Sequence, residues 1–143
     1  MTRGEKNKNL GNIKIANNDW KGKIPEDQNT DGVFEQFETE YYGNRALVIL
    51  LQNYINRGIN TIDSIINTYA PKSENETAIY VDYVKLRMGF TTIGDAGVDG
   101  DHIPQLATAI VEFENGKSYP GIRQKFTRVL LGLKYNDYLK HKK

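Results

Sequence analysis

The chain has 143 residues, no cysteine and a formal net charge of +1, and 38% of its residues are hydrophobic. This length and composition predict one folded domain rather than two domains or a disordered segment. The absence of cysteine excludes disulfides, thiolate metal sites and a cysteine nucleophile. No apolar run is long enough to cross a bilayer, and the polar first ten residues predict no signal peptide.

The first forty residues are rich in Asn, Gly and Pro and show no helical period. Two short stretches, residues 12–15 and 33–37, are alternating or rich in β-formers, which is typical of strands. We therefore predict an irregular β region over residues 1–40.

Helical periodicity begins near Tyr42 and recurs in separate segments as far as Leu133. The predicted stops are Gly58, the residue before Pro71, Gly89 and Asn115-Gly116. The predicted starts are Thr61 as a cap, a capping box from Ser73 to Glu76, Pro104 in a first turn, and the segment after Pro120. Ile79, Tyr80, Tyr83 and Val84 are predicted to face inward on the helix that follows Ser73.

These elements predict a mainly α fold of the α+β class, with about five helices and a small N-terminal β element. We expect one domain over residues 1–143. Its parts are the irregular region 1–40, a helical body at 41–135 and a basic tail at 136–143.

The segment at residues 94–101 is rich in Gly and Asp, as calcium-binding loops are. Gly97 and Leu106 fall where that pattern requires ligands, so the match fails. His102 lacks a second histidine at helical spacing and is interpreted as a surface residue. We predict no metal and no cofactor.

Glu114 is the leading candidate for a general acid. It ends an apolar helix just before Asn115-Gly116, where carbonyl dipoles repel negative charge and favour a protonated carboxyl group. A protonated glutamic acid is what cleavage of a glycosidic bond requires. The alternative is that Glu112 and Glu114 are solvated acids at a fraying helix end, and spacing alone leaves both interpretations open.

Several motifs in a fixed order resemble a family of phage and prophage proteins labelled virion structural proteins. The matching segments are Arg3-Gly4, Asn7 to Ile13, Trp20-x-Gly22, Phe34 to Phe37, Gly43 to Ala46, Tyr69-Ala70-Pro71 and Glu114-Asn115-Gly116. The family pattern has Arg, Asn, Pro and Ile where this chain has Lys6, Lys8, Leu10 and Asn44.

The same segments are similar, more distantly, to lysozyme-like glycan hydrolases and transglycosylases. In those chains the helix that carries the acid comes first, whereas here it comes last, so the resemblance implies a circularly permuted lysozyme-like domain. It implies Glu114 as the catalytic acid and Glu5 as a second choice. Substrate binding would fall to the residues Asn12, Trp20, Tyr80, Asn9 and Arg45. If the permutation is right, Glu114 must lie within about 10 Å of Asn12 and Tyr80, on the order of one pocket's width.

We therefore expect a phage-associated enzyme that cleaves peptidoglycan glycan strands, as a muramidase or a lytic transglycosylase. It would be a monomer, found in the virion or in the host cytoplasm before delivery to the cell wall, with other virion proteins as further partners. The alternative is a non-catalytic virion structural or cell-wall-binding protein with the same fold. A third hypothesis, nucleic-acid binding, has only the basic ends in its favour, because no aromatic residues are interleaved with them.

Overall fold

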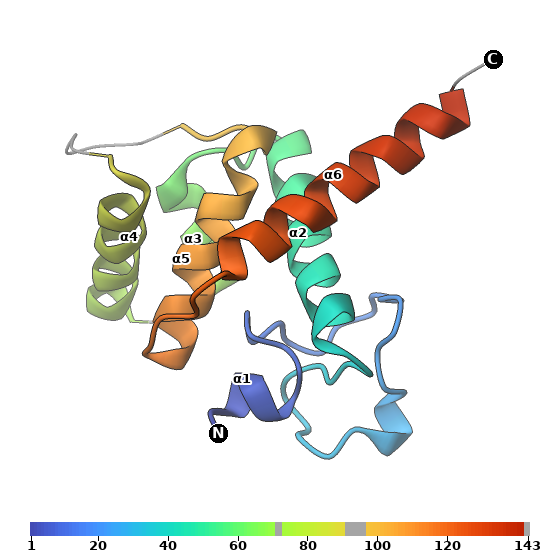
Figure 1. Ribbon diagram of the computed structural model, residues 1–143. Coiled ribbons are helices and arrows are strands. Elements are labelled where there is room, and N and C mark those ends of the chain that lie inside the picture. Colours follow the sequence, from blue (N-terminus) through green and yellow to red (C-terminus); the bar gives the residue numbers. More distant parts are fainter. Residues whose placement is uncertain (71–72, 91–96, 142–143) are drawn as a thin grey trace.

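The structure is a computed structural model that describes residues 1–70, 73–90 and 97–141. It is mainly α-helical, as predicted (Figure 1). The elements in chain order are α1 (Arg3–Lys6), η1 (Glu26–Gln28), α2 (Glu40–Asn56), α3 (Ile62–Tyr69), α4 (Glu74–Met88), η2 (Gly100–His102), α5 (Ile103–Asn115) and α6 (Ile122–His141).

Local signals set most of the helix ends. The Thr61 side chain accepts a hydrogen bond from Ser64 N and caps α3, and Pro104 lies in the first turn of α5. Gly89 and Gly116 end α4 and α5 in the left-handed conformation, with φ of 81° and 68°. Glycine reaches this conformation without steric cost, so the sequence pattern was sufficient here.

Helix α5 is the centre of the core. Nine of its 13 residues are buried, and it packs against α2, α4 and α6. Figure 1 shows α4 on one side of α5, with α6 crossing both α5 and α2. Because α5 is enclosed on several sides, a polar side chain on it must find a partner inside the protein.

The N-terminal region differs from the prediction, because it forms no strand among the described residues. Isolated bridges pair Lys14 with Phe34 and Lys23 with Phe37. Single backbone bonds, such as Glu35 N to Ile13 O at 2.9 Å, hold these segments together. The β element therefore consists of paired loops lying beside the start of α2 (Figure 1).

Two further predictions about helices were wrong. Ile79 was expected to face the core, but it is 62% exposed, and Val81 is buried with Tyr80 and Val84. Helix α6 continues to His141, so residues 136–141 are helical rather than a tail. Figure 1 shows this part of α6 projecting beyond the other helices. Of the two hydrogen bonds in the capping box predicted at Ser73, the structure has one, in which Ser73 Oγ accepts from Glu76 N.

Candidate functional site

Glu114 and Asn12 meet at the C-terminal end of α5. Asn12 Nδ2 donates a hydrogen bond to Glu114 Oε1 over 3.0 Å, across 102 positions of sequence. Asn12 has a φ of 53°, in the left-handed region that asparagine tolerates better than most residues. Glu114 is half-buried in the last turn of α5. The structure thus joins two residues that the resemblance assigned to one site.

The loop that presents Asn12 is held from within by Asn9. Asn9 is fully buried, its Oδ1 accepts from Ile13 N at 3.0 Å, and its Nδ2 donates to Ile13 O and Glu35 O. Its backbone carbonyl also accepts from Asn12 N at 3.0 Å. Asn9 was predicted to bind substrate, but all its polar atoms are used inside the protein, so here it shapes the loop around Asn12.

Two side chains fasten this loop to the helical body. Tyr69 Oη, at the end of α3, donates to the carbonyl oxygen of Gly11. Asn115 Nδ2 donates to Leu10 O at 2.7 Å, and Asn115 Oδ1 accepts from Thr2 Oγ1 at 2.6 Å. Asn12 is therefore placed by contacts on residues that flank it, and these contacts come from α3 and α5.

Tyr80 lies behind Glu114. The Tyr80 side chain is fully buried, and its ring stacks on Phe113 with centroids 3.9 Å apart. Burial raises the pKa of the Tyr80 hydroxyl well above its ordinary value, and the neighbouring Glu114 carboxylate raises it further. The pKa of Tyr69 is raised by the same two causes in the same order. Both phenols are therefore neutral hydrogen-bond donors at physiological pH.

The hydroxyl of Tyr80 has no hydrogen-bond partner among the described residues, although Glu114 is close enough to shift its pKa. Oδ1 of Asn12 is likewise buried and unpartnered within that part of the chain. A Cβ at Gly4 would lie 2.6 Å from Asn115 Oδ1 and 3.3 Å from Asn12 Oδ1, so glycine at this position leaves room for both amides. Buried polar atoms without partners are costly and often mark sites that do more than support the fold.

Glu5 is the second candidate acid, and both oxygens of its carboxylate have partners inside the protein. Its Oε1 accepts from Thr2 N, and its Oε2 accepts from Tyr119 Oη and pairs with Lys117. Lys117, then Thr2 and Tyr119, lower the pKa of Glu5 to about 2. Glu5 is thus held ionised, and it fastens α1 to the segment that follows α5.

Trp20 and Arg45 are placed apart from these contacts. Trp20 belongs to the core and is 8% exposed, which leaves little of its ring for stacking on a sugar. Arg45 is half-buried on α2 and makes no hydrogen bond or ion pair with another described residue. Of the predicted site residues, the structure brings together Glu114, Asn12 and Tyr80.

No role in the site was predicted for Tyr69 or Asn115, although both lie in the motifs of the resemblance. The alternative interpretation, in which Glu112 and Glu114 are both solvated acids, is wrong for Glu112. Glu112 is 5% exposed, accepts from Tyr83 Oη at 3.0 Å, and forms a two-pronged ion pair with Arg87. Glu112 lies within an apolar segment of α5, and this position was the feature of the sequence that could have predicted its burial.

Metal ligation has no support in the described part of the chain, where no group of three or more His, Asp or Glu side chains is gathered. The loop tested for calcium lies partly outside the described residues, which omit 91–96. Within the described ranges no helix has the length and apolarity needed to span a membrane.

Comparison with protein-family models gives no match. The chain is 30% identical over 131 residues to Protein P5 of Pseudoalteromonas phage PM2. The alignment covers 87% of this chain and 79% of the phage protein. With this identity and coverage, the chain belongs to the same family as the phage protein P5.

Proposed function

We propose that this protein cleaves the glycan strands of peptidoglycan, with Glu114 as the general acid. The observation that carries the proposal is the 3.0 Å hydrogen bond from Asn12 to Glu114, close to the buried Tyr80 hydroxyl. A circularly permuted lysozyme-like site requires this contact. It joins the helix that bears the acid to a loop near the N-terminus.

The chemistry needs two proton transfers at one carboxyl group, with a different proton in each. Glu114 gives its proton to the glycosidic oxygen as the bond from that oxygen to the sugar's anomeric carbon breaks. The ionised Glu114 then takes a proton from the group that attacks the anomeric carbon. If water attacks, the product is a reducing end, and if the sugar's own C6 hydroxyl attacks, the product is an anhydro end.

Asn12 suits an acid that changes its protonation state. In the observed orientation Asn12 Nδ2 donates to Glu114 Oε1, which can accept as part of an ionised carboxylate. A half-turn of the amide would present Oδ1, which is now unpartnered among the described residues, as an acceptor for the protonated carboxyl group. The same side chain therefore has a hydrogen bond to offer before and after proton transfer.

The contacts of Glu5 favour a route with a single catalytic carboxylate. Its oxygens accept from Thr2, Tyr119 and Lys117, so it is not a free nucleophile. In such a route Glu114 serves first as acid and then as base, and anhydro ends are the expected product.

The experiment is digestion of purified peptidoglycan by the wild type and by Glu114→Gln, with soluble muropeptides identified by mass spectrometry. Glu76→Gln, a change of an exposed acid on α4, is the matched control. Anhydro or reducing ends from the wild type and the control, with none from Glu114→Gln, would support the proposal. Intact glycan after incubation with the wild type would refute it.

A second candidate is a non-catalytic virion or cell-wall-binding protein. One observation favours it: the Asn12–Glu114 bond also fastens the N-terminal loop to α5, so these residues have a structural use without catalysis. This candidate predicts that peptidoglycan retains the protein undamaged and that Glu114→Gln binds as well as the wild type.

A further inference from the structure

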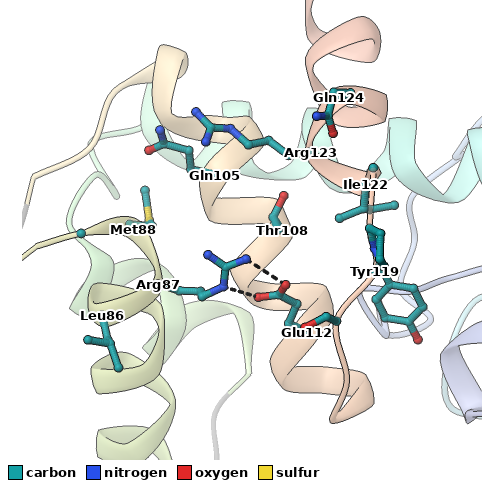
Figure 2. A pocket seen from close by; sticks show the side chains of 14 residues that line it. Leu86, Arg87, Met88, Gln105, Thr108, Glu112, Tyr119, Ile122, Arg123 and Gln124 are labelled. Atoms are coloured by element: carbon teal, nitrogen blue, oxygen red, sulfur yellow. Dashed lines mark hydrogen bonds and ion pairs between the residues drawn. The ribbon is translucent and has the colours of Figure 1, made fainter.

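A cavity of about 420 Å³ opens between α4, α5 and the start of α6 (Figure 2). Its volume falls in the range of small-molecule pockets. Glu114, Asn12 and Tyr80 are not among its lining residues. The cavity is therefore separate from the proposed catalytic site, and a ligand could bind in it whether or not Glu114 is a catalytic acid.

One wall of the cavity carries an ion pair whose carboxylate is buried and whose guanidinium is partly exposed. Arg87 Nε donates to Glu112 Oε1 at 2.8 Å, and Arg87 Nη2 donates to Glu112 Oε2 at 3.1 Å. The Glu112 side chain is 4% exposed, whereas that of Arg87 is 50% exposed. The carboxylate thus fixes the guanidinium, and the remaining N–H groups of Arg87 are left for another acceptor.

A second guanidinium reaches the cavity from the first turn of α6. Arg123 lines it, and Figure 2 shows the Arg123 side chain extending toward Gln105 above the Arg87–Glu112 pair. Within the described part of the chain Arg123 makes no ion pair or side-chain hydrogen bond. Unlike Arg87, Arg123 pairs with no carboxylate of a described residue.

The charges of the described residues on the cavity wall do not cancel. Arg87 and Arg123 contribute two positive charges and Glu112 one negative charge, which leaves +1, and the other lining residues that the structure describes are uncharged. The neutral polar groups include the amides of Gln105 and Gln124 and the hydroxyl of Ser118. This wall would complement a polar ligand that carries a single negative charge.

We propose that this cavity binds a small molecule or chain end through one carboxylate, held between Arg87 and Arg123. Planar guanidinium groups match the two oxygens of a carboxylate and form charge-assisted hydrogen bonds with them. Glu112 is a positioning residue, because it holds Arg87 in place. The amides of Gln105 and Gln124 bind the polar body of the ligand.

The test is a titration of the ¹⁵N-labelled protein, followed by NMR, with N-acetylalanine as the carboxylate probe. N-acetylalaninamide is the uncharged probe of the same shape, and inorganic phosphate is the competing anion. Arg123→Gln removes the free guanidinium. Arg128→Gln is the matched control, because it makes the same change on the same helix at a residue that does not line this cavity.

Saturable shifts at cavity residues with N-acetylalanine, and none with the amide, are the expected result. Arg123→Gln should weaken binding about tenfold, the effect of losing a charge-assisted contact, whereas Arg128→Gln should leave it unchanged. Arg87→Lys keeps the positive charge but loses the planar pair of N–H donors, so it should also weaken binding. The melting temperature of this variant shows whether its fold is intact.

Three outcomes would overturn the inference. The first is equal shifts with N-acetylalanine and N-acetylalaninamide. The second is binding that is unaffected in both Arg123→Gln and Arg87→Lys. The third is the lack of a saturable shift up to about 50 mM N-acetylalanine, a concentration above which binding is too weak to indicate a specific site. Tighter binding of phosphate than of N-acetylalanine would overturn the assignment to a carboxylate.

Discussion

The side-chain amide of Asn12 donates to the carboxylate of Glu114 over 3.0 Å, although 102 positions of sequence separate the two residues. The bond closes the N-terminal loop onto the last turn of α5. Thr2 and Leu10 reach the same turn through Asn115. The candidate site therefore exists only when the N-terminal loop and α5 are both folded. For this reason, each test of activity needs its own measurement of stability.

Replacing Asn12 with glycine should reduce glycan cleavage about a hundredfold, the usual effect of removing one hydrogen-bond donor from a reacting centre. Glycine adopts the positive φ of 53° freely, so the substitution adds no backbone strain, and a lower melting temperature would report the loss of the Asn12–Glu114 bond. Lys8→Gly is the matched control, because Lys8 has nearly the same φ, 54°, and contacts Glu38 rather than Glu114. Equal losses of activity in the two variants would contradict the role of the Asn12 amide.

Replacing Tyr69 with phenylalanine should lower the free energy of unfolding by about 1–3 kcal/mol, because it leaves the Gly11 carbonyl without its donor. Urea unfolding measures the change. Tyr135→Phe, at a side chain that is 60% exposed, should shift stability by less than about 0.5 kcal/mol. If the two variants are equally stable, the Tyr69–Gly11 contact does not hold the loop.

Two glycine-to-alanine changes in helices should have opposite effects. A Cβ at Gly43 would overlap the carbonyl oxygen of Lys8, so Gly43→Ala should cost about 3 kcal/mol of stability. A Cβ at Gly132 meets no described atom within 4 Å, so Gly132→Ala should gain about 0.5–1 kcal/mol from helix propensity. Chemical denaturation of both variants checks the prediction, and a neutral Gly43→Ala would show that the loop does not lie against α2.

Stability should fall in acid partly because of Glu5. Its pKa is lowered from 4.5 to about 2, chiefly by Lys117, so the folded state favours the ionised form. The stabilising contribution is fully present above pH 4.5 and is lost as the pH falls toward about 2. Glu5→Gln should flatten this part of the pH profile of thermal unfolding, whereas Glu76→Gln should not. Parallel profiles for all three proteins would contradict the Lys117–Glu5 pairing.

Helix boundaries were predictable because short-range chemistry sets them. Thr61, Pro104 and Gly116 act on the backbone within a few residues of themselves, and the structure confirms all three. The two strands predicted at residues 12–15 and 33–37 do not form in the described structure. A strand needs a partner in register, and the N-terminal segments pair only at isolated bridges.

The sequence determined by itself that α5 would carry two acids near its end, just before a left-handed stop at Gly116. Only the tertiary structure decided what each acid does. Residues two apart on a helix point in different directions, so Glu112 faces Arg87 on α4 while Glu114 faces Asn12 on the N-terminal loop. Which face meets which partner depends on how the chain packs around α5, and no local pattern encodes that.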